Sequence, residues 1–148
     1  MIVSIFRSVG AVIAGLIVAL ILIIVVEGIS AVFHPFPPGV DPNNYELCKA
    51  HVAQYPHWLL GVVVVLWGMI ALVCSWLATR LGTGRHSAHG RVVGFLLFLP
   101  MIVNVATLPY PIWFGLFNLI AIPMATILGT MLGRGTIFGL RQPSDPTA

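Results

Sequence analysis

Four long apolar stretches constrain the fold of this chain more than any other feature. They cover about residues 8–33, 58–79, 92–108 and 112–133. A bilayer core about 30 Å thick is crossed by about 20 apolar residues in a helix, so each stretch is long enough or nearly so. Only 7% of the 148 residues are charged, whereas about a quarter are charged in soluble domains. The sequence therefore predicts an all-α membrane protein, an antiparallel bundle of four transmembrane helices in a single domain over residues 1–133.

The first apolar stretch has a second interpretation, a cleaved signal peptide. Its uncharged run from Val9 to Val26 is longer than the apolar region of a typical signal peptide, and no clear small-residue cleavage site follows it. We therefore expect a first transmembrane helix that is retained.

Basic residues gather on one side of the predicted spans. That side holds Arg7, Arg80, Arg85, Arg91, Arg134 and Arg141. The opposite side holds Lys49, within the predicted outer loop 34–56. Because Lys and Arg near span ends favour the cytoplasmic side of a membrane, both termini should be cytoplasmic, including the tail 134–148. The same rule predicts that loop 34–56 faces outside.

Small residues recur at helical spacing within the predicted spans. Lipid tails are as apolar as leucine, so transmembrane helices associate through close backbone approach, which small residues permit. We predict packing at Ala11, Gly15, Ala19, Gly61, Gly68, Ser75, Ala121, Ala125, Gly129 and Gly133. The sequence leaves open whether some of these faces contact another copy of the chain. Pro100, near the middle of the third span, predicts a kink.

Polar residues occur at a similar depth, near the outer end, in all four predicted spans. The predicted polar cluster comprises Glu27, Ser30, His34, His57, Asn104, Thr107 and Asn118. A carboxylate facing hydrocarbon is costly, and such groups usually face the interior of a bundle. We therefore predict that the Glu27 carboxyl lies within hydrogen-bond reach of Asn104, Asn118, His34 or His57. If so, Glu27→Gln should preserve the fold and Glu27→Leu should leave the amides unpaired and destabilise it.

This polar cluster has a structural and a functional interpretation. It could hold four helices in register, or it could bind an ion, a proton or a small polar ligand. His34, His51 and His57 are weak metal candidates, since imidazole suits zinc and copper but their spacing matches no tight site. No metal or other cofactor is predicted. Cys48 and Cys74 lack the spacing of a metal site or a disulfide framework.

Several short elements carry a resemblance. They are Glu27, "PPGVD" at 37–41, Pro56, Asn104 and "PYPIW" at 109–113. With the four spans, they resemble a family of small uncharacterised four-span bacterial inner-membrane proteins, over most of the chain outside the tail. The resemblance implies a bacterial source and an inner-membrane location. That family has no established activity, so the resemblance assigns no catalytic role.

Three functional hypotheses follow. The first is a membrane protein without enzymatic activity, an accessory or complex-forming subunit, because the chain is small and has no recognisable catalytic set. The second is a small transporter or an ion- or proton-binding protein using Glu27, Asn104 and Asn118. The third is an enzyme at the outer leaflet with Glu27 and His34 or His57 as acid and base. A polar cavity at Glu27 favours the second or third, and a dry, packed cluster favours the first. The expected partners are the lipid bilayer and other membrane subunits or copies of the chain; no basic cluster is large enough to indicate nucleic acid.

Overall fold

The computed structural model describes residues 2–39, 41 and 44–135. Within them the chain forms helices and turns and no strand. The elements are α1 (Ile2–Phe33), α2 (Tyr45–Val52), α3 (His57–Leu81), the 3-10 turn η1 (Thr83–Arg85), α4 (Ser87–Thr107) and α5 (Ile112–Arg134). Of the predicted cytoplasmic tail, Arg134 and Gly135 are described, and Arg141 lies outside the described residues.

Four helices of the described chain, α1, α3, α4 and α5, are long and apolar enough to cross a membrane. This confirms the prediction of an all-α protein with four candidate spans. Two helices begin earlier than the apolar pattern predicts: α1 at Ile2 and α4 at Ser87. The reason at α4 is a cap, because the His86 side chain accepts a hydrogen bond from the Ala88 backbone N–H at 3.2 Å. Hydropathy marks the apolar part of a helix, whereas caps mark its ends.

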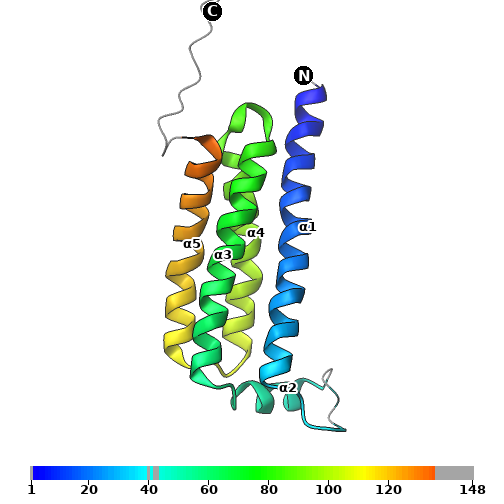
Figure 1. The fold of residues 1–148 in the computed structure, drawn as a ribbon, viewed down its shortest axis with the longest axis vertical. Coiled ribbons are helices and arrows are strands. Elements are labelled where there is room, and N and C mark those ends of the chain that lie inside the picture. The colour runs from blue at the N-terminus through cyan, green and yellow to red at the C-terminus, as the bar shows by residue number, and fades with distance from the viewer. Residues whose placement is uncertain (1, 40, 42–43, 136–148) are drawn as a thin grey trace, which may run out of the picture.

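The four long helices lie side by side, with the start of α1 and the end of α5 at the same end of the molecule (Figure 1). The short helix α2 lies at the other end, in the connection from α1 to α3. Helix α3 is the centre of the packing, because it contacts α5, α1 and α4 extensively. Helix α1 packs mainly against α3 and much less against α4. Helix α4 is continuous through Pro100.

Most of the predicted small residues are buried, and some of them allow close backbone contacts. Ala11, Gly15 and Ala19 are all buried on α1. A Cβ at Gly15 would lie 3.2 Å from the backbone oxygen of Cys74. On α5, a Cβ at Gly129 would collide with the backbone of Leu72 on α3.

Gly61 differs from the other predicted packing positions. A Cβ there would meet nothing within 4 Å, so this glycine serves no close contact inside the described chain. Gly68 is intermediate, since its Cβ would lie 4.0 Å from Ala121.

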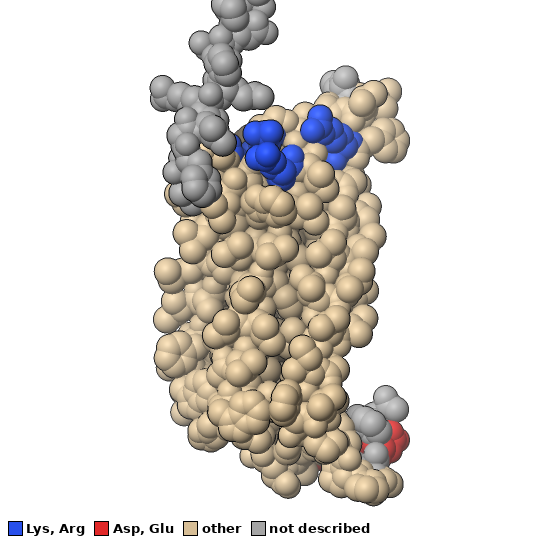
Figure 2. Space-filling model, in the orientation of Figure 1, with Lys and Arg blue, Asp and Glu red and all other residues tan. Residues whose placement is uncertain are grey.

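The described arginines and the charged side chains of α2 lie at opposite ends of the molecule. One end, which we call the basic end, is formed by the start of α1, the α3–α4 connection and the end of α5, and it holds Arg7, Arg80, Arg85, Arg91 and Arg134. Figure 2 shows blue side chains at this end and red ones at the opposite end, which we call the α2 end. Between them the visible surface is uncharged, as expected for a surface in contact with lipid.

Candidate functional site

A cavity of about 170 Å³ lies between α1, α3 and α4 in the half of the molecule towards the α2 end. Most of its walls are apolar. The lining residues are Ile23 and Glu27 of α1, Trp67, Ile70 and Ala71 of α3, Leu97, Pro100, Met101 and Asn104 of α4, and Ile122 of α5. Apolar walls with a few polar groups are typical of small-molecule sites.

The cavity opens sideways, between α1 and α4. Its floor is made of buried residues, with Ala71, Met101 and Ile122 exposing 1%, 5% and 3% of their surface. Its rim is exposed, since Glu27 on α1 and Pro100 on α4 both reach the surface. The opening follows from the sparse packing of α1 against α4. In a membrane, this opening would face the lipid.

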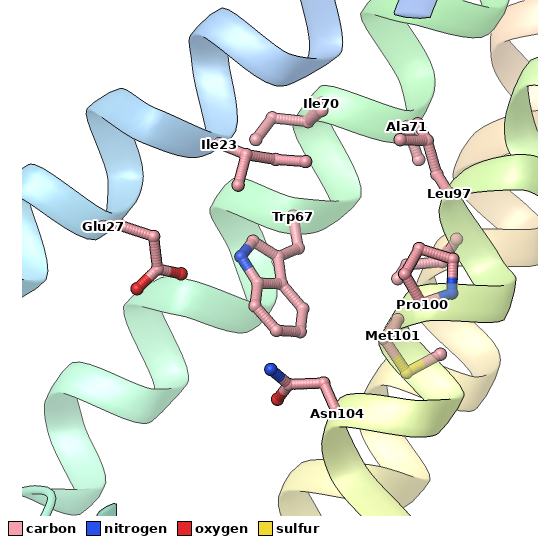
Figure 3. Close-up of a pocket in the computed structure, with 10 residues that line it drawn as sticks. Ile23, Glu27, Trp67, Ile70, Ala71, Leu97, Pro100, Met101 and Asn104 are labelled. Atoms are coloured by element: carbon pink, nitrogen blue, oxygen red, sulfur yellow. The ribbon is translucent and has the colours of Figure 1, made fainter. Parts of the chain in front are cut away.

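Three polar side chains converge on the cavity. Glu27 points from α1 and Asn104 points from α4 towards the ring of Trp67, whose nitrogen edge faces Glu27 (Figure 3). The Nε1 atom of Trp67 and the Oδ1 atom of Asn104 are buried, and neither has a hydrogen-bond partner among the described residues. Buried polar atoms are normally paired, and leaving one unpaired costs about 1–3 kcal/mol. Two residues that line the cavity therefore each carry an unpaired buried polar atom, near a carboxylate.

The hydrogen bond predicted for Glu27 is not formed. Within the described residues, its carboxylate makes no hydrogen bond or ion pair with Asn104, Asn118, His34 or His57. Glu27 and Asn104 instead line the same cavity without touching. Asn118 is fully buried but donates from Nδ2 to the Phe114 carbonyl of its own helix at 2.9 Å, and it does not line the cavity.

Two of the predicted histidines, His34 and His51, contact each other at the α2 end. His34 Nε2 lies 3.3 Å from the His51 carbonyl oxygen, and the two rings stack with centroids 4.2 Å apart. Phe36 stacks on the other side of His51 at 3.8 Å. His57 lies elsewhere, with its ring 5.9 Å from that of Trp113. Among the described residues, no group of three or more His, Cys, Asp or Glu side chains could hold a metal ion.

The remaining members of the predicted cluster also lie outside the cavity. Ser30 is buried on α1. Thr107 is exposed at the end of α4, where its hydroxyl donates to the Val103 carbonyl at 2.8 Å and its carbonyl accepts from the Tyr45 hydroxyl at 3.0 Å. This last bond ties α2 to α4.

The Glu27 carboxylate contributes to the raised pKa values of two tyrosines at the α2 end. Burial raises the pKa of Tyr110, and the Glu27 carboxylate raises it further. Burial also raises the pKa of Tyr55, again with a smaller contribution from Glu27. Neither residue can be linked to Glu27 from sequence, because both lie in connections whose path depends on the fold.

Trp67 is the site residue that sequence analysis missed. Tryptophan in membrane proteins is enriched at the interfaces, where its N–H reaches water. Trp67 lies well inside α3 instead, in an apolar run. A tryptophan so far from a helix end was the available signal for a polar requirement at this depth.

Comparison with protein-family models, with curated proteins and with solved structures finds no match to this chain. The geometry of the cavity is therefore the basis for proposing a function.

Proposed function

We propose that this chain is a multi-pass protein of the bacterial inner membrane, in which α1, α3, α4 and α5 form an antiparallel four-helix bundle. The basic end faces the cytoplasm and the α2 end faces outside. The support for this orientation is the collection of arginines at one end, because positive charge near span ends favours the cytoplasmic side. The inner-membrane location rests on the resemblance described above.

Within this frame, the protein binds a small amphiphilic molecule in the cavity between α1, α3 and α4. One observation carries this proposal. Glu27 lines an apolar cavity together with Trp67 and Asn104, each of which has an unpaired buried polar atom. A ligand that pairs these atoms offsets the cost of leaving them unpaired. The apolar walls contribute binding through contact with the rest of the molecule.

The ligand enters from the outer half of the bilayer, because the cavity lies towards the α2 end and opens between α1 and α4. Towards the basic end the helices are too tightly packed for a continuous passage. A Cβ at Gly90 or Gly94 of α4 would collide with Thr79 of α3 or Thr126 of α5. A binding site reached from the lipid fits this arrangement better than an open pore does.

A cavity-blocking substitution tests the proposal. Ile23 lines the cavity, whereas its neighbour Ile24 is 63% exposed on the outer surface of α1. Native mass spectrometry of protein extracted from its own membrane should show a bound small molecule on the wild type and on Ile24→Trp. Ile23→Trp should lose it. Retention of the molecule by Ile23→Trp would refute the cavity as its binding site.

A second candidate function, a complex-forming subunit, is favoured by two other glycines. A Cβ at Gly10 or at Gly28 of α1 would meet nothing within 4 Å, so packing inside the described chain does not require either glycine. Glycine in a helix costs about 0.5–1 kcal/mol relative to alanine, and in membranes it permits close approach of another helix. Gly28→Leu should then leave the fold intact and remove a partner subunit from the purified complex. An unchanged complex would count against this candidate.

A further inference from the structure

The cavity contains a negative charge and no positive one. Glu27 is the one charged residue in its lining, which includes no lysine, arginine or histidine. The five described arginines lie at the basic end, away from the α2-end half in which the cavity lies. A carboxylate withdrawn from water is expensive unless an opposite charge or hydrogen-bond donors accompany it. The missing component of this site is therefore cationic.

The polar and aromatic groups of the cavity specify the cation further. The Glu27 carboxylate accepts hydrogen bonds through two oxygens, so it favours a cation that also donates hydrogen bonds. The Trp67 ring lies beside Glu27 in Figure 3, and the face of an indole attracts cations more strongly than any other side-chain ring. A protonated amine supplies both requirements at once, because it carries positive charge and several N–H donors.

The size and walls of the cavity set the shape of the rest of the ligand. An apolar cavity of about 150 Å³ accommodates benzene, so a cavity of about 170 Å³ accommodates one ring or a short branched chain. Ile70 and Met101 are buried apolar residues on its walls. Any longer tail must leave through the opening between α1 and α4, where it would lie among lipid chains.

We propose that the cavity recognises a primary or secondary ammonium ion attached to a compact apolar body. The ammonium group donates to the Glu27 carboxylate beside the Trp67 ring, and the apolar body fills the space against Ile70 and Met101. The indole N–H, whose edge faces Glu27, is the donor available to the second carboxylate oxygen. This inference rests on the proposed function, since it names the chemical class of the ligand for the same cavity.

The test compares two probes of nearly equal shape, 2-phenylethylammonium and the neutral 2-phenylethanol. Their binding is measured by isothermal titration calorimetry on the full chain in lipid nanodiscs, with the heat of empty nanodiscs subtracted. We expect the ammonium ion to bind at least ten times more tightly to the wild type. Glu27→Gln should reduce its affinity to that of the alcohol. Glu46→Gln is the matched control, because Glu46 is an exposed glutamate of α2 outside the cavity, and it should leave both affinities unchanged.

Each other outcome has a distinct meaning. Equal affinity for the two probes, abolished by Ile23→Trp, would overturn recognition of an ammonium ion while leaving the proposed ligand-binding function in place. Absence of binding by both probes would count against the inference and, together with an empty cavity in native mass spectrometry, against the proposed function as well. A preference for the ammonium ion that survives in Ile23→Trp would place that preference outside the cavity and overturn the inference. Ile23→Trp keeps all three polar groups, so it remains informative if Glu27→Gln fails to fold.

Discussion

At the scale of single residues, Glu27 has the most unusual environment, a carboxylate at the rim of an apolar cavity without a protein partner among the described residues. A charged side chain within a membrane span costs up to a few kcal/mol at the centre and less near the edge. We therefore predict that Glu27→Leu raises the free energy of unfolding by about 1 kcal/mol, because leucine removes a desolvated charge and strands no hydrogen-bond partner.

This expectation reverses the one drawn from sequence, in which leucine would leave paired amides unsatisfied. The measurement is thermal unfolding in detergent without ligand. Glu46→Leu, on the exposed face of α2, serves as the control and should change stability little. A clear loss of stability in Glu27→Leu would mean that the carboxylate has a partner inside the protein after all.

His51 gives the α2 end a dependence on pH. Burial lowers the pKa of His51, and the positive charge of His34 lowers it further, although a hydrogen bond between the two opposes this. A histidine with a lowered pKa binds protons more readily in the unfolded state, so its contribution to stability is complete above about pH 6.5 and is lost as the pH falls through the range below that value. We predict that moving from pH 7.5 to pH 5 lowers the protection factors of amide hydrogen exchange in α2 (Tyr45–Val52). In His51→Gln this loss of protection should be absent, and an equal loss in that variant would assign the effect to other groups.

At the scale of whole helices, the contact between α3 and α5 depends on glycine. A Cβ at Gly129 would collide with the Leu72 backbone, which can move only if the helices separate. We predict that Gly129→Ala lowers the free energy of unfolding by about 1–3 kcal/mol, the usual range for overpacking. Gly61→Ala is the matched control, because a Cβ there meets nothing within 4 Å, and it should stabilise α3 by about 0.5–1 kcal/mol. Equal effects in reversible unfolding in detergent would contradict the assigned packing face.

The helices could be predicted from sequence because length, hydropathy and small-residue spacing are local properties. The short helix α2 also has a local signal, because the Asn44 side chain accepts hydrogen bonds from the backbone N–H groups of Glu46 and Leu47 and so caps it. The cavity could be predicted only in part. The depth of Glu27 and Asn104 along their helices follows from sequence, but the rotation of each helix about its axis does not. That rotation directs Asn118 to its own backbone and brings Trp67, from another helix, beside Glu27.

At the scale of the whole molecule, the two ends differ in construction. The basic end is closed by tight contacts, and the first turns of α1 are joined to the α3–α4 connection, where Thr83 donates to the Ser4 carbonyl at 2.9 Å and Arg7 Nε donates to the Leu81 carbonyl at 3.0 Å. The α2 end is held by stacked rings and one tyrosine hydrogen bond above a half-open cavity. Ligand exchange through the opening between α1 and α4 is therefore expected in the half of the molecule towards the α2 end, while the basic end keeps the four helices together.

The orientation of the whole molecule can be tested with cysteines. Cys48 lies on α2, whereas Cys74 is fully buried in α3 and should not react. If the basic end is cytoplasmic, a maleimide that cannot cross membranes should label Cys48 in spheroplasts. A cysteine at Ala88, an exposed position at the start of α4, should be labelled only after the membrane is made permeable, in a Cys48→Ser background. Labelling of Ala88→Cys in intact spheroplasts, with Cys48 protected, would invert the orientation. The cavity would then open to the cytoplasmic half of the bilayer, and its ligand would have to come from that side.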